Sequence, residues 1–178
     1  MATRIWDLLD NGFWNVAENW SEDILPGPED NVVIGVDGEI EVTQQSGSTA
    51  IKSLISEAIL NLSGGSFTVT EEANLNALLK SSGSTATFNG SSNLLGFDFS
   101  KGTLSGTGAL TTEGPSTWTG GVYSGSGLTI NEGGTLELSG SNAKTLSGVL
   151  ENRGITTWTD GDINSNSSGT WNTAETAL

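Results

Sequence analysis

The chain has 178 residues and a net charge of −15, from 6 basic and 21 acidic side chains. It contains no cysteine and no histidine, which excludes disulfides, thiolate metal sites and the imidazole base of a Ser-His-Asp triad. The negative charge argues against nucleic acid and anionic membrane surfaces as partners, because both attract basic patches. With 25 glycines and only 15% charged residues, the composition favours extended β structure over a helical bundle.

The first 30 residues are rich in aromatic side chains, with Trp6, Phe13, Trp14 and Trp20 set among acidic residues. The repeats farther along the chain predict a solenoid, whose first coil would expose an apolar cross-section and unpaired strand edges. We therefore expect residues 1–30 to form an N-terminal cap. A carbohydrate-binding aromatic platform is the alternative interpretation of the same cluster.

Residues 31–49 alternate between apolar and polar side chains, first around Val32 and Ile34 and then around Ile40 and Val42. This period of two predicts a pair of short strands in the first coil. Asp37-Gly38 between them is a tight-turn signal.

Residues 50–80 give conflicting signals. Six apolar residues fit a helical spacing: Ile51, Leu54, Ile55, Ala58, Ile59 and Leu62. In contrast, Ile59–Leu62, the glycines after it and Phe67–Val69 read as strand, turn and strand. We predict strands for 50–70, and leave a short helix or an irregular loop open for 71–80.

Residues 81–101 contain serine- and glycine-rich corners, and here the repeat slips. Phe97 and Phe99 fall one residue to either side of the position that Trp118 would predict. An insertion in a loop is the expected cause.

Residues 102–172 carry a 20-residue repeat built from short alternating segments and glycine corners. The repeat predicts coils stacked about 4.8 Å apart, with equivalent side chains in interior columns and glycines at the corners. Three sets of residues keep the interval: Gly114, Gly134 and Gly154; Leu110, Ile130 and Leu150; Trp118, Leu138 and Trp158.

Two segments near the N-terminus, Trp14–Ser21 and Leu25–Ile34, resemble the opening of a β-helix in large bacterial surface proteins. These are autotransporter-like and filamentous-haemagglutinin-like proteins of the cyanobacterial type, and Leu104–Leu110 and Thr117–Gly121 resemble their coils. The resemblance implies an all-β fold: a single-stranded right-handed parallel β-helix of about seven coils, with residues 1–30 as cap and 31–178 as coils. It brings no catalytic residue with it, and in place of the family's glycine-rich loop this chain has Glu22–Leu25.

Few residues are candidates for chemistry. Asp160-Gly-Asp162 and Asn164–Asn166 lie at a predicted corner, where a solvated turn is favoured over a Ca²⁺ site because the calcium-binding nonapeptide pattern is absent. Glu137 and Asp160 are carboxylate candidates for glycoside hydrolysis only because acidic residues are common here. The scattered basic residues, with Lys144 and Arg153 in the coils, give little support for a polysaccharide lyase. We expect no enzyme, no cofactor and no metal site.

Two binding surfaces remain as alternatives. Trp118 and Trp158 would stack on sugar rings if they were exposed, although their alternation with threonine predicts that they point inward. Threonines beside them form short rows of the kind that would bind ice, interrupted at Glu137 and Ser139: Thr117, Thr119, Thr157 and Thr159.

The sequence therefore predicts a non-catalytic structural stalk or adhesin segment of a secreted or cell-surface protein. A carbohydrate-binding or polysaccharide-degrading β-helix module is the alternative. Expected partners are surface glycans, the remainder of a longer parent protein from which this piece is cut, and a second copy meeting it end to end. Membrane insertion is not expected, because no apolar run approaches the ~20 residues needed to cross a bilayer.

Overall fold

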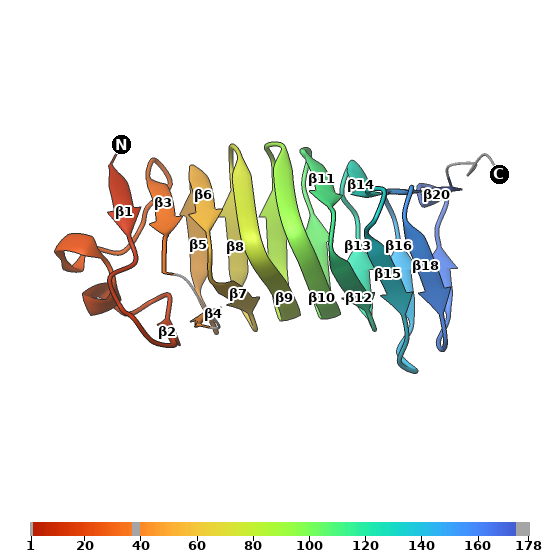
Figure 1. Cartoon of the computed structure of the whole chain (residues 1–178), viewed down its shortest axis with the longest axis horizontal. Helices are drawn as coiled ribbons and strands as arrows, with labels where there is room; N and C mark the ends of the chain where they lie inside the picture. The colour runs from red at the N-terminus through yellow and green to blue at the C-terminus, as the bar shows by residue number, and fades with distance from the viewer. Residues whose placement is uncertain (1, 37–39, 174–178) are drawn as a thin grey trace.

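The computed structural model describes residues 2–36 and 40–173 and shows a β-solenoid of about seven turns. Its 20 strands pair in parallel from coil to coil, and the two ends of the chain lie at opposite ends of the rod (Figure 1). The prediction of an all-β solenoid is thus confirmed. The predicted turn at Asp37-Gly38 lies largely outside the described residues, since only residues 2–36 and 40–173 are described.

The strands form three ladders, which we call faces A, B and C. Face A contains β1 (Thr3–Ile5), β3 (Asn31–Ile34), β6 (Ser53–Ser56), the first parts of β9 (Ala73–Phe88) and β10 (Ser92–Ser105), β11 (Ala109–Thr112), β14 (Gly127–Ile130), β17 (Val149–Asn152) and β20 (Thr170–Thr173). Face B contains β2 (Gly12–Phe13), β4 (Glu41–Gln44), β7 (Ile59–Leu62), the middle of β9 and β10, β12 (Pro115–Trp118), β15 (Thr135–Leu138) and β18 (Ile155–Trp158). Face C contains β5 (Ser48–Ile51), β8 (Ser66–Val69), the last parts of β9 and β10, β13 (Gly121–Tyr123), β16 (Lys144–Leu146) and β19 (Ile163–Ser165).

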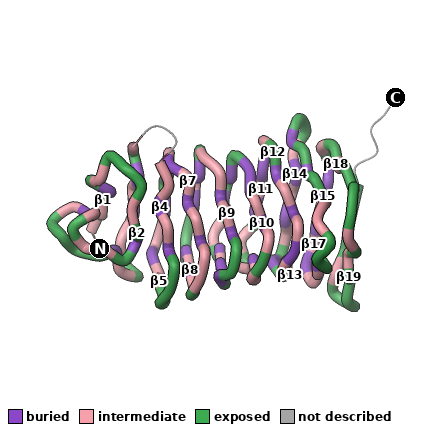
Figure 2. The backbone as a smooth tube through the Cα atoms, turned by 90° about the horizontal axis from the view of Figure 1, so that it is seen from below, coloured by how far each residue is buried: buried purple, intermediate pink, exposed green. Residues whose placement is uncertain are grey.

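The core is a continuous apolar column inside these faces. Strand after strand buries every second residue, as the alternating purple segments of Figure 2 show. The ladder Trp118–Leu138–Trp158 has the predicted register, and so does the glycine series before it, since Pro115, Thr135 and Ile155 pair in turn.

The predicted column Leu110–Ile130–Leu150 is wrong at its centre. Leu110 pairs with Leu128, and Leu128 pairs with Leu150, while Ile130 pairs with Thr112 and Asn152. The two steps are therefore 128 − 110 = 18 and 150 − 128 = 22 residues, whose mean is the apparent period of 20. A slip of two residues keeps a side chain on the same side of a strand, so both leucine and isoleucine still point inward.

The strands predicted for 50–70 are confirmed as β5 to β8. The helical spacing arises from corners between these strands: Leu54, Leu60 and Leu62 are buried, but Ile55 is 46% exposed. The helix or loop left open for 71–80 is wrong, because these residues enter β9, which bends around all three faces and pairs with β6, β7 and β8.

The register slip at 81–101 has another cause than the expected loop insertion. β10 runs without a break through this region and absorbs the extra residues as irregularities in its pairing with β9, between Leu94 and Gly96 and again between Phe99 and Thr103. Phe99 pairs with Trp118, and their rings stack with centroids 6.0 Å apart.

The N-terminal segment packs its tryptophans across the end of the core. Trp6, Trp14 and Trp20 are each at most 2% exposed, and the Trp20 indole N–H donates to the Trp14 carbonyl oxygen at 2.7 Å. The Trp14 ring meets Phe67 edge to face at 4.9 Å. Two 3-10 turns, η1 (Ala17–Asn19) and η2 (Ser21–Asp23), carry the chain across this end, while β1 and β2 already belong to the ladders.

Candidate functional site

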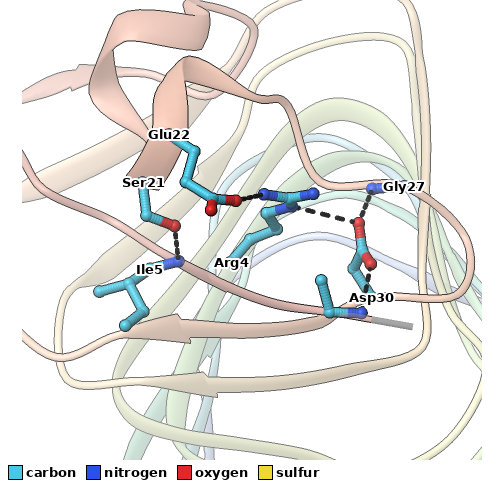
Figure 3. A network of polar contacts seen from close by, with 7 residues as sticks. Arg4, Ile5, Ser21, Glu22, Gly27 and Asp30 are labelled. Carbon is cyan, nitrogen blue, oxygen red and sulfur yellow. Dashed lines mark hydrogen bonds and ion pairs between the residues drawn. The ribbon is translucent and has the colours of Figure 1, made fainter.

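A polar network ties the N-terminal segment to the first coil (Figure 3). Asp30 accepts the backbone N–H of Ala2 at 2.9 Å and of Gly27 at 3.1 Å, and lies 3.6 Å from the Arg4 guanidinium. These backbone donors first, and Arg4 second, hold the pKa of Asp30 below its usual value although burial opposes them. Arg4 also pairs with Glu22 at 2.6 Å. Each charged group is thus matched within the network, which favours a structural role.

The same segment closes the strand edges at this end. The Ile5 N–H on β1 donates to Ser21 Oγ at 3.0 Å, and the Phe13 carbonyl on β2 accepts from Asn19 Nδ2 at 3.0 Å. Capping an edge in this way prevents another chain from adding a strand there. Beside β5, the Leu25–Pro28 segment lines an open groove of about 370 Å³ with no charged residue in its walls.

The basic residues considered for a lyase are both engaged internally. Lys144 is fully buried, and its ammonium donates to the carbonyl oxygens of Gly140, Asn142 and Asp160 at 3.2–3.3 Å. Arg153 pairs with Glu151 at 2.7 Å. The Lys144 ammonium therefore stabilises two corner turns and is not presented to a substrate.

The structure separates the two carboxylate candidates. Glu137 projects from the middle of β15 on face B, whereas Asp160 lies in the turn after β18 and accepts the Gly161 N–H at 2.7 Å. Among the residues that the structure describes, no group of three or more acidic side chains is arranged to hold a metal ion. Within that same set, no helix is long and apolar enough to span a membrane.

The two tryptophans considered for sugar stacking have different environments. Trp118 is 1% exposed, and its indole N–H donates to the Gly120 carbonyl at 3.0 Å. Trp158 occupies the equivalent inward position in the last described coil of face B but is 57% exposed. A single exposed indole replaces the pair, so the flat aromatic platform that motivated the sugar-binding alternative is not formed.

The threonine rows beside these tryptophans are as short as the sequence indicated. Thr117 and Thr157 lie in one outward file of face B with Glu137 between them, and Asp98 precedes them. A carboxylate thus lies inside the row and another at its end.

Face C carries a longer array of hydroxyl groups, which the sequence analysis missed. Its outward residues form two files that flank the buried column Phe67, Ala86, Leu104, Tyr123 and Leu146. The first file is Ser48, Ser66, Thr85, Thr103, Val122, Thr145 and Asn164, and the second is Ala50, Thr68, Thr87, Ser105, Ser124, Ser147 and Asn166. None of these residues is charged. The signal was a recurrent Ser/Thr-x-Ser/Thr triplet, seen at 66–68, 85–87, 103–105 and 145–147.

No protein family model matches this chain, and neither a curated protein nor a solved structure matches it.

Proposed function

We propose that this chain is a non-catalytic structural module, a stiff β-solenoid rod that forms part of a secreted or cell-surface protein. The observation that carries the proposal is the unbroken parallel ladder from β1 to β20, with one core running its length. Seven coils at the usual strand separation give a rod roughly 30 Å long. The resemblance of Trp14–Ser21 and Leu25–Ile34 to bacterial surface proteins supports the location.

The rod resists bending because each inner strand is hydrogen-bonded on both sides and its side chains pack on their equivalents above and below. The N-terminal end is closed by three buried tryptophans and by the Ser21 and Asn19 edge contacts. At the other end, Ile155 and Trp158 are exposed apolar side chains in the last described coil of face B. They support the proposal that this end meets another polypeptide.

The proposal is tested by asking for catalysis and for mechanical resistance in the same preparation. Incubation with a panel of neutral and acidic polysaccharides should release neither reducing ends nor unsaturated products. Pulling the chain through its ends in a force spectrometer should give high resistance, because the strands separate in succession. Product that disappears in Glu137→Gln or Asp160→Asn would replace the structural role with an enzymatic one, and unfolding at negligible force would remove the stiff rod.

A further inference from the structure

Face C is a two-dimensional lattice of hydroxyl groups with regular spacing. Along the rod its residues repeat at the strand separation of about 4.8 Å, and across each strand the two files are two residues, or about 6.7 Å, apart. The pairing that sets this lattice continues from β5 to β19 on this face. The lattice therefore extends over seven strands.

The lattice is uncharged in a chain whose net charge is −15. Outward files on the other faces contain ionic groups, such as Lys80, Asp98 and Glu137 on face B and Glu151 on face A. Charged groups hold their own hydration shells and disturb ordered water around them, whereas hydroxyls donate and accept hydrogen bonds as water does. Face C thus offers the one outward surface in the described coils whose paired files contain no ionic side chain.

The lattice is also held rigidly. The residues between the two files are buried, with Phe67 and Ala86 fully inaccessible and Leu104 and Tyr123 at 2% exposure. Neighbouring hydroxyls contact one another along the files: Ser66 Oγ donates to Ser48 Oγ at 2.9 Å, and Thr87 and Ser105 lie 3.2 Å apart. Threonine side chains have few rotamers because they branch at Cβ. A preorganised surface loses little entropy when it binds.

These properties select a partner that is itself periodic, rigid and uncharged. The outward files carry no aromatic residue, and buried aromatic and arginine anchors are what a protein interface normally needs. Sugar rings likewise bind by stacking on aromatic faces. A lattice of water, in contrast, meets each hydroxyl with an oxygen that both donates and accepts.

We propose that face C binds ice. The many weak contacts of its serine and threonine hydroxyls with ordered water would add up over the length of the rod, because all of them meet the lattice in the same register. This activity goes beyond the structural role and does not depend on it. The rows considered from sequence lie on face B and are interrupted by Glu137; the surface proposed here is a different one.

The test uses paired lysine substitutions on two faces. Thr85→Lys with Thr103→Lys places two charges at adjacent positions in the centre of a face C file. The matched control, Thr111→Lys with Thr129→Lys, makes the same change at adjacent positions of an outward file on face A. We expect the native chain to show thermal hysteresis and to inhibit ice recrystallisation, the face C variant to lose both, and the control to keep them.

Several results would overturn the proposal. One is a native chain with full β-sheet circular dichroism and no effect on ice growth, and another is equal loss in both double variants. Sedimentation with crystalline cellulose or chitin that is abolished only by the face C variant would assign this surface to a polysaccharide instead. If the face C variant does not fold, Ser124→Lys with Ser147→Lys, on the second file, takes its place in the same comparison.

Discussion

Trp118 and Trp158 provide a matched pair of core substitutions, because they occupy the same ladder two coils apart but differ in burial. Trp118 is 1% exposed and stacks on Phe99, whereas Trp158 is 57% exposed. Fully burying an indole removes about 200 Å² from water, which is about 5 kcal/mol at 25 cal/mol per Å². Truncations of buried Phe and Trp to alanine typically cost about 3–5 kcal/mol. We therefore expect Trp118→Ala to lower the free energy of unfolding by about 4 kcal/mol.

Trp158→Ala removes the less buried side chain. With 57% of that side chain in water, the same arithmetic leaves less than half the transfer term, about 2 kcal/mol. Urea unfolding followed by circular dichroism measures both values, and the two variants should differ by roughly 2 kcal/mol. Equal losses would refute the reasoning, since they would mean that position in the ladder, and not burial, determines the contribution of each tryptophan.

The remaining predictions concern pH and the corners. Because Ala2 and Gly27 N–H groups, and then Arg4, lower the pKa of Asp30, its stabilising effect is present above the unfolded value near 3.9 and is lost as pH falls below that value towards the lower folded pKa. Asp30→Asn should remove this acid-dependent step from the thermal unfolding midpoint measured between pH 5 and pH 2; an unchanged pH profile would contradict the network's role. Gly47→Ala should cost only the left-handed conformation, about 1–2 kcal/mol, since its φ is +82° and a Cβ there meets nothing within 4 Å. Gly65→Ala should cost about 1–3 kcal/mol more, because at φ +74° its Cβ would overlap the Gly47 carbonyl oxygen; identical melting points for the two variants would count against this packing of the corner.

The repeat allowed the solenoid to be predicted, but not its register. Trp118, Leu138 and Trp158 aligned because both of their coils have 20 residues, whereas the coils between Leu110, Leu128 and Leu150 have 18 and 22. A shift of two residues leaves the inward and outward pattern unchanged, so alternation alone could not locate it. The strand through 71–80 was obscured for a related reason, because bends in β9 between faces disturb a simple period of two.

The candidate surface depended on information that the sequence does not carry locally. The Ser/Thr triplets of face C are visible in the chain, but their steps of 19, 18 and 42 residues conceal that they lie on one face. Their alignment is set by pairing across corners of different length, through strands such as Gly121–Tyr123 that lack the triplet. The burial of Lys144 is similar, since its three carbonyl partners come from turns after β15 and β18.

The stacked ladder itself is best tested by a distance along face C. Ser48 and Asn164 lie in one file, six strand spacings apart, which corresponds to about 29 Å between their backbones. Because the chain has no cysteine, Ser48→Cys and Asn164→Cys accept spin labels at those two positions alone, and electron–electron double resonance should give one narrow distance near that value. Moving the first label to Ser66→Cys should shorten it by a single spacing of about 4.8 Å. A broad distribution, or no shortening, would contradict the solenoid and everything inferred from its faces.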